Sequence, residues 1–510
     1  MKNTFRKLST VLLALVMIFA MSISTFAASG SGTNLGSDGS INPDKSGIIS
    51  NGGVRENGTD SGETAGGKHT HGTFTAVGNT ITLDKEIVIF NTRSSDTVVY
   101  LPNIKYEYAV EAVDVTNDTG SEKYITDEYG NKGAINDGVA AAINNSDTPY
   151  VEFSNDSGIS GTGMTAVTTP YVTTTKDGIA AEGHFNLTFN PSNFTKPGVY
   201  RYKVTESVAS GYGKAMAGII DNGTYNAERY LDVYVQNNAA GTGYEIYGYV
   251  CFEDTSKDKE FEANPGTPIT AKTNGFVSEK NDTIKDKYSK TEEGVDIYET
   301  SNVKIMKTIT GAMADKSHLF PFEATFANST ITKNPKICWV KVETGTEDTT
   351  SNSNPTTMTN GTGVVGAASA SGTLKLKDGE FIYVYGVPGK EAANSKGTTT
   401  VLTKEYNDTA EEYTVSAKYD TAEDDDTLND IDVKAATTGK AVQMAAGATA
   451  EFNAAQTLHI AKVQNIAEVT NKLNAISPTN VVMRFAPYLF ILGGAVLLLF
   501  ASRRRKAEQE

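Results

Sequence analysis

The sequence predicts an all-β protein built from two tandem domains, and three observations support this fold class. Apolar side chains recur at every second residue, the period of a strand, in runs such as residues 81–89 and 200–206. Clusters of Gly, Asn and Pro separate these runs, as turns separate strands. A chain of 510 residues with 20 Phe and 24 Tyr also has enough length and aromatic surface for two cores.

The domain boundaries follow from where this pattern stops and restarts. A charged, weakly patterned stretch interrupts the strand-like runs, and a new run begins at Val303. We therefore expect a first β domain over residues 73–278, a linker over 279–300 and a second β domain over 301–476. Further strands are predicted at residues 230–235, 244–252, 267–272, 337–342, 374–376, 381–387, 413–417 and 458–463.

The amino-terminal end carries an export signal. Residues 1–27 contain basic residues, then an apolar run, then the small residues Thr25 and Ala27 that precede a secretory cleavage site. Residues 28–72 are rich in Gly, Ser and Asn and indicate a flexible leader to the first domain. The chain is therefore expected to be exported.

The carboxy-terminal end has the pattern of a membrane anchor. Residues 485–501 carry no charge and are just long enough to span the hydrocarbon of a bilayer. The basic residues 503–506 follow and are expected to stay on the cytoplasmic side. We therefore expect residues 477–510 to form an anchoring segment with a transmembrane helix and a basic tail.

Composition excludes several classes of function. A formal net charge of −16 would repel the phosphates of a nucleic acid, so we expect no nucleic-acid partner. Two Cys are too few for a disulfide framework. His69 and His71 could supply two metal ligands, but no further Cys, His or carboxylate cluster completes a site. No motif for turnover of a nucleotide or ester is found either. We expect no cofactor, no metal and no enzyme with an external substrate.

Three charged residues lie in phase with apolar ones and are therefore predicted to point into the cores. Lys85 lies on the same strand face as the apolar residues Leu83 and Ile87, and Lys307 lies on the same face as Ile305 and Ile309. Glu206 is in phase with Tyr200 and Val204. Burying such a charge without compensation costs several kcal/mol. The simplest compensation is a buried Lys–Glu ion pair, or a lysine stem that carries its amine out to water.

A covalent explanation competes with the ion pair. Burial disfavours both charged forms, so the lysine loses its proton and the glutamic acid keeps one. The neutral amine is then a nucleophile. If an Asn amide lies beside it, the acid can polarise that amide and transfer protons while ammonia leaves. The product is a Lys–Asn isopeptide bond, formed once in the life of each molecule.

Two segments resemble a known family. Residues 185–189 (FNLTF) and 194–206 (FTKPGVYRYKVTE) resemble the signature of the streptococcal pilin isopeptide linkage domain of Gram-positive major pilins. The second half resembles the partner domain of these pilins through residues 303–311 (VKIMKTITG), 320–322, 376–380 and 386–388. The resemblance implies two immunoglobulin-like, Cna-B-like β sandwiches. In such pilins, a lysine on the first strand, an asparagine on the last strand and a glutamate between them form the isopeptide bond.

In the first domain the resemblance assigns Lys85 as the amine, Glu206 as the catalytic acid and Asn274 as the acceptor amide. The core-face phase supports Lys85 and Glu206 independently. Asn237 and Asn238, at the end of another predicted strand, are the alternatives to Asn274.

In the second domain the resemblance places Lys307 and Asn465 by position and by face. Lys404 stands where the family has its glutamate, so Glu405, which is in phase with Val401, is taken as the acid. A shift of one residue would reverse its face. An ordinary ion pair, or no bond at all, remains the alternative.

The resemblance also implies attachment by a sortase. Pro478, Thr479 and Asn480 precede the apolar span and resemble a sorting motif, with Asn480 in place of the usual glycine. Cleavage after Thr479 would pass its acyl group to a neighbouring subunit or to peptidoglycan. The amine that receives the acyl group is expected at Lys257, with Lys259 beside it as the other choice. An unprocessed single-span membrane protein is the alternative.

Taken together, the sequence predicts a structural protein of a Gram-positive-type cell surface, anchored in the cell wall or membrane. We expect it to be a pilus backbone subunit, a major pilin, whose partners are a sortase, neighbouring pilin subunits or peptidoglycan, and the membrane through residues 485–501. An adhesin with a host surface ligand, built on the same sandwich scaffold, is the main rival. The polar stretch 344–371 is where such a ligand-binding insertion would lie, although it is also typical of a surface loop.

Overall fold

The computed structural model describes residues 78–91, 97–117, 124–126, 132–144, 146–174, 179–221, 226–252, 275–277, 296–343, 354–389, 396–420, 429–431, 433–434, 438–439, 441–452, 456–459, 465–473, 488 and 491–500. These residues form almost only strands, arranged as two β sandwiches. The predicted all-β fold is confirmed.

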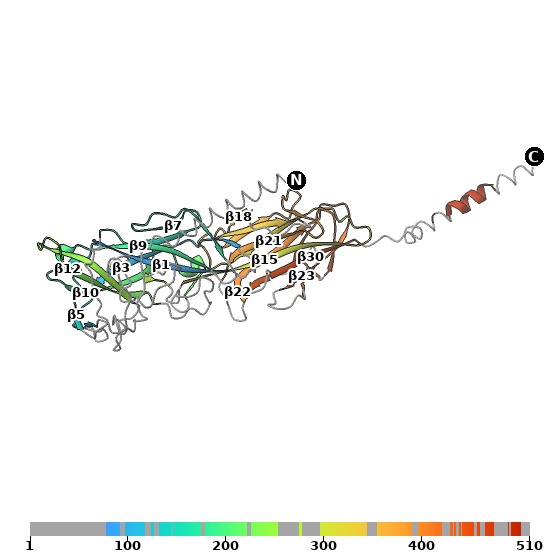
Figure 1. Cartoon of the computed structure of the whole chain (residues 1–510). Helices are drawn as coiled ribbons and strands as arrows, with labels where there is room; N and C mark the ends of the chain where they lie inside the picture. Colours follow the sequence, from blue (N-terminus) through green and yellow to red (C-terminus); the bar gives the residue numbers. More distant parts are fainter. Residues whose placement is uncertain are drawn as a thin grey trace, which may run out of the picture.

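One strand, β15 (Asp296–Thr310), belongs to both sandwiches. Its first half runs parallel to β1 (Thr80–Asn91), with Asp296 opposite Ile87. Its second half runs parallel to β30 (Asn465–Lys472) and antiparallel to β21 (Phe381–Pro388). Figure 1 shows the consequence, an elongated molecule in which the two β bodies lie end to end along β15.

The first domain packs a sheet around β1 against a second sheet of order β13-β12-β10-β3-β6-β7. In the first of these sheets, β1 pairs with β9 (Ile179–Thr188), β14 (Gly275–Phe276) and β15, and β11 (Ile219–Asp221) pairs with β15. The facing sheet consists of β3 (Ile104–Ala112), β6 (Tyr150–Ser154), β7 (Gly158–Gly161), β10 (Gly198–Val208), β12 (Glu228–Asn237) and β13 (Tyr244–Phe252), with β4 (Tyr124–Thr126) and β5 (Lys132–Asn136) attached. The remaining elements are the pair β2 (Thr97–Tyr100) and β8 (Tyr171–Thr174), the turns η2 (Ala140–Ala142) and η3 (Pro191–Asn193), and the short helix α2 (Lys214–Ala217).

The second domain packs the sheet that continues through β15 against a sheet centred on β16 and β22. The first sheet consists of β18 (Asn354–Thr357), β17 (Lys336–Val342), β21, β15, β30, β23 (Tyr413–Asp420) and β24 (Asn429–Ile431), with β27 (Ala441–Met444) on β23. The facing sheet consists of β19 (Thr362–Gly366), β16 (Phe320–Ala327), β22 (Lys396–Tyr406), β28 (Thr449–Phe452), β25 (Val433–Lys434) and β26 (Thr438–Gly439), with β20 (Lys375–Leu376) and β29 (Gln456–His459) attached.

The strand at the domain junction departs from the predicted boundaries. The expected linker 279–300 ends inside β15, because residues 296–300 pair with β1. The edge of β1 is thus occupied by two separate segments: Phe276 of β14 lies opposite Lys85, and Asp296 of β15 lies opposite Ile87. The strand over residues 296–300 was not predicted because the stretch that contains it is charged and lacks clear apolar periodicity.

The last strand of the second domain also lies later than predicted. The sequence analysis placed a strand at 458–463, whereas β29 covers part of that stretch and β30 begins at Asn465. In β30 the buried positions alternate with half-exposed ones, but two of its four buried side chains are asparagines. Apolar periodicity is weak where polar residues occupy the core positions, so the strand was missed.

The stretch expected as a polar surface loop contributes two strands. β18 pairs with β17, and β19 pairs with β16. Met358 and Val365 are buried in the core of the second domain, which explains why part of this stretch is ordered into the sandwich.

The face of β10 opposite to that of Tyr200 and Glu206 is also partly buried. Arg201 is fully buried and forms a two-bonded ion pair with Asp232 of β12, with its Nε and Nη2 atoms 2.8 and 2.7 Å from the two carboxylate oxygens. Val199 of β10, Tyr234 of β12 and Val250 of β13 form a small apolar cluster on the same face of the sheet. The fork of a guanidinium matches a carboxylate, which is why Arg rather than Lys occupies such a site.

The targeting segments fall largely outside the described residues. Residues 1–27 and 28–72 lie outside them, as do most of residues 477–510. Residues 491–500 are helical, with exposed side chains such as Leu498 and Phe500. Within the described part of the chain, no helix combines the length and the hydropathy that a membrane crossing requires.

Candidate functional site

The first site is a buried amine between two carboxylates. Lys85 of β1 has no solvent exposure, and its Nζ lies 2.6 Å from Oδ2 of Asp296 and 3.1 Å from Oε1 of Glu206. Asp296 begins β15 in the same sheet, whereas Glu206 reaches in from β10 of the facing sheet. The structure therefore brings Lys85 and Glu206 together as the sequence analysis expected, and adds Asp296.

Two tyrosines donate hydrogen bonds to the carboxylates. Tyr106 donates to Oδ2 of Asp296 at 2.7 Å, and Tyr108 donates to Oε2 of Glu206 at 3.0 Å. Burial, and then the Glu206 carboxylate, raise the pKa of Tyr108 well above its ordinary value, so its hydroxyl remains a donor. Both tyrosines are nearly fully buried on β3.

Aromatic rings exclude water from this site. Lys85 Nζ lies 4.2 Å from the ring centroid of Tyr106. Tyr108 stacks on Phe185 of β9 with a centroid distance of 3.6 Å and also contacts Phe276 of β14. Arg229 holds β14 in place, because its Nε donates to the Gly275 carbonyl at 2.7 Å. Electrostatic interactions between charged groups are stronger where water is excluded than in bulk water.

The Asp296 carboxylate lies between two positively charged ammonium groups. Lys85 faces its Oδ2, and the ammonium of Lys214 lies 2.8 Å from its Oδ1. Burial alone would raise the pKa of Asp296, but the two ammonium groups outweigh burial and hold this pKa below its ordinary value. Asp296 is therefore an ionised carboxylate in the folded chain.

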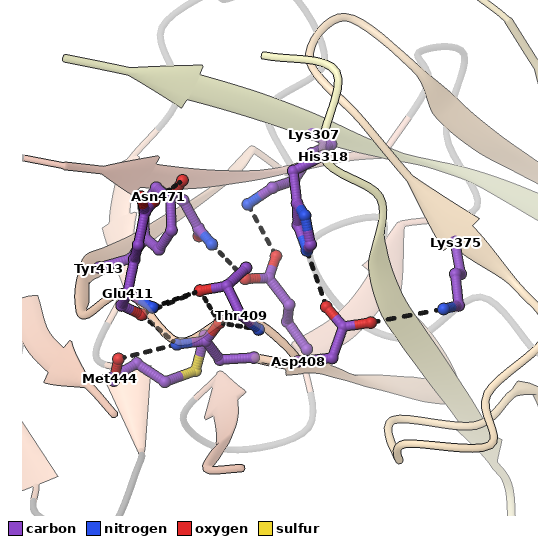
Figure 2. Close-up of polar contacts among 11 residues, drawn as sticks. Lys307, His318, Lys375, Asp408, Thr409, Glu411, Tyr413, Met444 and Asn471 are labelled. Atoms are coloured by element: carbon purple, nitrogen blue, oxygen red, sulfur yellow. Dashed lines mark hydrogen bonds and ion pairs between the residues drawn. The ribbon is translucent and has the colours of Figure 1, made fainter. Parts of the chain in front are cut away.

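The second site repeats the arrangement with an amide. Lys307 Nζ lies 2.8 Å from Oε2 of Glu405, and Nδ2 of Asn471 donates to Oε1 of the same carboxylate at 2.6 Å. Figure 2 shows Lys307 and Asn471 pointing toward the same carboxylate from neighbouring strands. All three side chains are fully buried.

Burial sets the protonation of this pair. It lowers the pKa of Lys307 to about 8, against the opposing attraction of Glu405. It also raises the pKa of Glu405, although Lys307 and Asn471 oppose the rise. Both shifts lower the cost of converting the ion pair into the neutral amine and the protonated acid, which is the protonation state that nucleophilic attack requires.

Aromatic rings also cover the second site. Lys307 Nζ lies 4.5 Å from the ring centroid of Phe320, which packs edge-on against Tyr413. His318 packs against the same Phe320. Its Nε2 lies 2.7 Å from Oδ1 of Asp408. Figure 2 shows these His318 and Asp408 side chains facing each other. The polar His–Asp pair thus lies outside the aromatic cover, and the lysine lies inside it.

The two sites share one strand register. In the first domain Asp296 lies opposite Ile87, two residues after Lys85. In the second domain Asn471 lies opposite Ile309, two residues after Lys307. Both pairs of strands are parallel, and in each domain the glutamate comes from the opposite sheet. The same geometry therefore presents a carboxyl-type carbon to each lysine.

The register corrects the acceptor of the second domain. Asn465 lies opposite Val303, four residues before Lys307, or about 13 Å along the strand at ~3.3 Å per residue. Its Nδ2 donates instead to the Asn302 carbonyl at 2.7 Å. Asn471 occupies the place that the sequence analysis gave to Asn465, because β30 starts later than the predicted strand.

The acceptors considered for the first domain do not meet Lys85 in the described residues. Asn274 lies outside them, next to Gly275, which is opposite Asp84. Asn237 and Asn238 lie at the end of β12, past the pairing of Val235 with Gly198. Gly198 itself is about 26 Å along β10 from Glu206, at ~3.3 Å per residue, and both asparagines lie farther away still.

The residues expected to serve in attachment also lie outside the described part of the chain. They are Lys257 and its neighbour Lys259, together with Pro478, Thr479 and Asn480. The two cysteines, Cys251 and Cys338, are both buried. No group of three or more His, Cys, Asp or Glu side chains that could hold a metal occurs among the described residues.

Sequence reasoning missed Asp296 and Asn471. Asn471 carried a usable signal, because it is in phase with Ala467 and Val469, which are both buried. Asp296 carried little signal, because it stands within a charged stretch and starts a strand whose partner lies some two hundred residues earlier in the chain. Asp296 is also not an asparagine, which is the residue type that the resemblance pairs with the lysine.

Similarity of this chain to known proteins is found among solved structures. No family model matches it, and no curated protein does. Among solved structures it is similar to the major pilin from Streptococcus pyogenes, with 17% identity, a TM-score of 0.36, and coverage of 78% of this chain and 99% of that one. The major pilin of another Streptococcus pyogenes serotype gives 15% identity, a TM-score of 0.31, and coverage of 78% and 99%. A pilus-presented adhesin from the same organism gives 10% identity, a TM-score of 0.20, and coverage of 77% and 99%. The likeness is one of fold.

Proposed function

We propose that this chain is a structural cell-surface protein, a pilus backbone subunit, whose two sandwiches are each closed by a self-catalysed isopeptide bond. The bonds join Lys85 to Asp296 and Lys307 to Asn471, with Glu206 and Glu405 as the proton-transfer groups. The observation that carries this proposal is the repeated register, which places a buried amine, a carboxyl-type carbon and a glutamate together in both domains. Ordinary buried ion pairs would not require the acceptor to recur at the same offset.

The chemistry of the second domain is an amide exchange. Glu405 accepts a proton from the Lys307 ammonium, and the neutral amine attacks Cγ of Asn471. Glu405, which already contacts Nδ2, delivers a proton to that nitrogen. The bond from Cγ to Nδ2 breaks and ammonia leaves with the proton. Nζ, now bonded to Cγ, gives one of its two remaining protons to Glu405 and keeps the other as the N–H of the new amide, so Glu405 ends protonated.

The chemistry of the first domain is a condensation. The Lys85 ammonium and the Asp296 carboxylate together contain the atoms of one amide and one water. Glu206 takes a proton from the amine and returns it to the departing oxygen. Because the amide product is the same as that from an asparagine, only the leaving group, water instead of ammonia, differs between the domains.

The mechanical consequence suits a fibre subunit. In the first domain the bond closes the loop from 85 to 296, and in the second the loop from 307 to 471. Both bonds attach to β15, so a continuous covalent path runs from Lys85 through β15 to Asn471. Tension along that path does not load the noncovalent contacts of either sandwich.

The attachment steps are part of the same proposal. Export through residues 1–27 and cleavage by a sortase after Thr479 would place the chain on a Gram-positive-type cell surface. The hydrophobic residues 485–501 would hold the precursor in the membrane, and the exposed apolar side chains of residues 491–500 support that assignment. Lys257 of a neighbouring subunit, or peptidoglycan, would receive the acyl group.

The proposal is tested by mass spectrometry of the purified full chain. We expect the mass to be lower than the mass calculated from the sequence by one water and one ammonia, after any terminal processing is accounted for. Cross-linked peptides should contain Lys85 with Asp296, and Lys307 with Asn471. Asp296→Asn should give the same bonded product as the natural chain, because loss of ammonia from Asn and loss of water from Asp leave one and the same amide.

Matched substitutions identify the acceptors. Asp296→Ala and Asn471→Ala should each abolish one mass deficit and leave the other. Asn465→Ala and Asn274→Ala should leave both, although Asn465→Ala removes a buried hydrogen bond worth about 1 kcal/mol. A full unmodified mass in the natural chain would mean that both lysines are ordinary ion-pair partners and would refute the proposal.

The rate of bond formation in the second domain should depend on pH with a maximum. The reactive pair, neutral Lys307 and protonated Glu405, holds one proton fewer than the fully protonated pair and one more than the fully deprotonated pair. Because the pKa of Lys307 is about 8 and that of Glu405 is raised, the rate should rise through mildly acidic pH and fall above about pH 8. Unfolded, unbonded chain would be refolded across this range and quenched for peptide mass analysis. A rate that keeps rising in alkali would show that the acid plays no part.

A further inference from the structure

We propose that Lys214 is a catalytic residue of the first domain, whose ammonium group neutralises the Asp296 carboxylate so that the Lys85 amine can attack it. The inference rests on the Lys85–Asp296 bond of the proposed function. It adds a fourth residue to the lysine, acid and acceptor, and it assigns that residue to the carboxylate acceptor only.

The two oxygens of Asp296 have different partners. Oδ2 faces Lys85 at 2.6 Å and accepts the hydrogen bond of Tyr106. Oδ1 faces the Lys214 ammonium at 2.8 Å. The Lys214 side chain is 16% exposed, whereas Lys85 and Asp296 are fully enclosed. Lys214 can thus keep its charge through contact with water while its ammonium lies on the buried carboxylate.

The fold holds Lys214 in this place. It opens α2, and the chain then turns at Gly218, whose φ of 83° lies in the left-handed region, into β11. β11 pairs antiparallel with β15, so that Asp221 lies opposite Asp296. The backbone N–H groups of Thr332 and Lys333 in the second domain donate to the Met216 carbonyl. Contacts with β15 and with the second domain therefore fix α2 beside the acceptor.

A carboxylate acceptor needs this cation for a reason that an amide does not. Attack on an amide carbon places one negative charge on the tetrahedral centre, whereas attack on an ionised carboxylate places two. A fixed ammonium beside one oxygen removes most of that cost in a dry site. The two ammonium groups also hold the pKa of Asp296 low, so protonation of the acceptor beforehand is disfavoured.

The second domain provides the comparison within the same chain. Oδ1 of Asn471 is buried and receives no hydrogen bond from any residue that the structure describes. Oδ1 of Asp296 is likewise buried without a well-aligned hydrogen bond from the described residues, but the Lys214 ammonium lies 2.8 Å from it. A lysine ammonium thus lies on Oδ1 of the charged acceptor, Asp296. Among the described residues no such group donates to Oδ1 of the neutral acceptor, Asn471.

The step balances as follows. Glu206 takes one of the three protons of the Lys85 ammonium, and the neutral amine forms the bond from Nζ to Cγ of Asp296. Charge gathers on Oδ1 beside Lys214. Oδ2 collects one proton from the attacking nitrogen and one from Glu206, the bond from Cγ to Oδ2 breaks, and water leaves. Glu206 and Lys214 end as they began, and one proton remains on the new amide.

The test compares Lys214→Gln in two backgrounds, the natural Asp296 and the variant Asp296→Asn. Unfolded, unbonded full chain would be refolded, quenched at intervals and analysed for cross-linked peptides from each domain. With Asp296 we expect Lys214→Gln to slow the Lys85 bond on the order of a hundredfold, the effect of losing one charge-stabilising donor. With Asp296→Asn we expect a slowing of a few-fold at most, and Lys214→Arg should recover much of the natural rate.

Internal controls separate the possible failures. The Lys307–Asn471 bond should form at the natural rate in every variant. Lys203→Gln removes a lysine of β10 that pairs with Glu228 of β12, and it should not slow the Lys85 bond. Equal slowing in both backgrounds would show a structural role and overturn the inference, as would no slowing or a bond from Lys214 itself to Asp296. If the natural chain forms no Lys85–Asp296 bond at all, the proposed function of the first domain fails and this inference fails with it.

Discussion

A Glu405→Gln variant is expected to fold and yet to lack the bond of the second domain. With Gln at position 405, no carboxyl group can pass a proton to Nδ2 of Asn471, so ammonia is not released. Loss of the cross-link between 307 and 471 should lower the free energy of unfolding of that domain by about 5 kcal/mol, from chain entropy alone. The unpaired buried ammonium should cost a further 3–5 kcal/mol or so. Calorimetry should show one transition moved far down in temperature, and mass analysis should show the ammonia retained.

A second variant separates the two contributions. Lys307→Met with Glu405→Leu removes both charges together with the bond, so only the cross-link contribution of about 5 kcal/mol should remain. Glu206→Gln should move the transition of the first domain and leave the second mass deficit intact. A Glu405→Gln chain that still releases ammonia would remove Glu405 from the mechanism.

The largest effect is expected under force. A single molecule pulled from the residues before β1 and the residues after β30 should show no unfolding of either sandwich. The load passes from Lys85 to Asp296, along β15 to Lys307, and from there to Asn471. The chain between 86 and 295 and between 308 and 470 lies outside that path, so it cannot be extended while the bonds hold.

The same experiment on a chain with Glu206→Gln and Glu405→Gln should give two unfolding events. The stretch from 86 to 295 should release on the order of 700 Å and that from 308 to 470 on the order of 500 Å, at about 3.4 Å per residue. Each single variant should give one event of the matching length. Release of either length from the natural chain would show that its bond is missing or lies at other residues.

Much of the lysine and glutamate chemistry could be derived from the sequence by periodicity. Lys85, Lys307 and Glu206 stand out because a charge occupies a core position in a strongly alternating strand. Glu405 was found through the family resemblance, with its phase relative to Val401 as support. Each of the four is buried in the structure, and each lysine contacts the expected glutamate. Face assignment needs only the local order of residues, which is why it succeeded.

The acceptors could not be derived in that way, because they depend on register between strands that are far apart in the chain. A strand of alternating faces presents several inward positions, and the sequence analysis chose Asn274 and Asn465 from among them. The parallel pairing of β15 with β1 and of β30 with β15 selects Asp296 and Asn471 instead. Register is a property of the pair of strands and is fixed by how the whole sandwich packs.

The sequence by itself thus determined the fold class, the two domains in outline, and which lysines and glutamates face the cores. It also predicts the signals at both ends, which lie largely outside the described residues. Only the tertiary structure decided that one strand serves both domains, which carbon faces each lysine, and that Lys214 lies on Asp296. The physical reason is the range of the interactions. The alternation of faces is local to a strand, whereas the atoms that react are brought together by pairings across hundreds of residues.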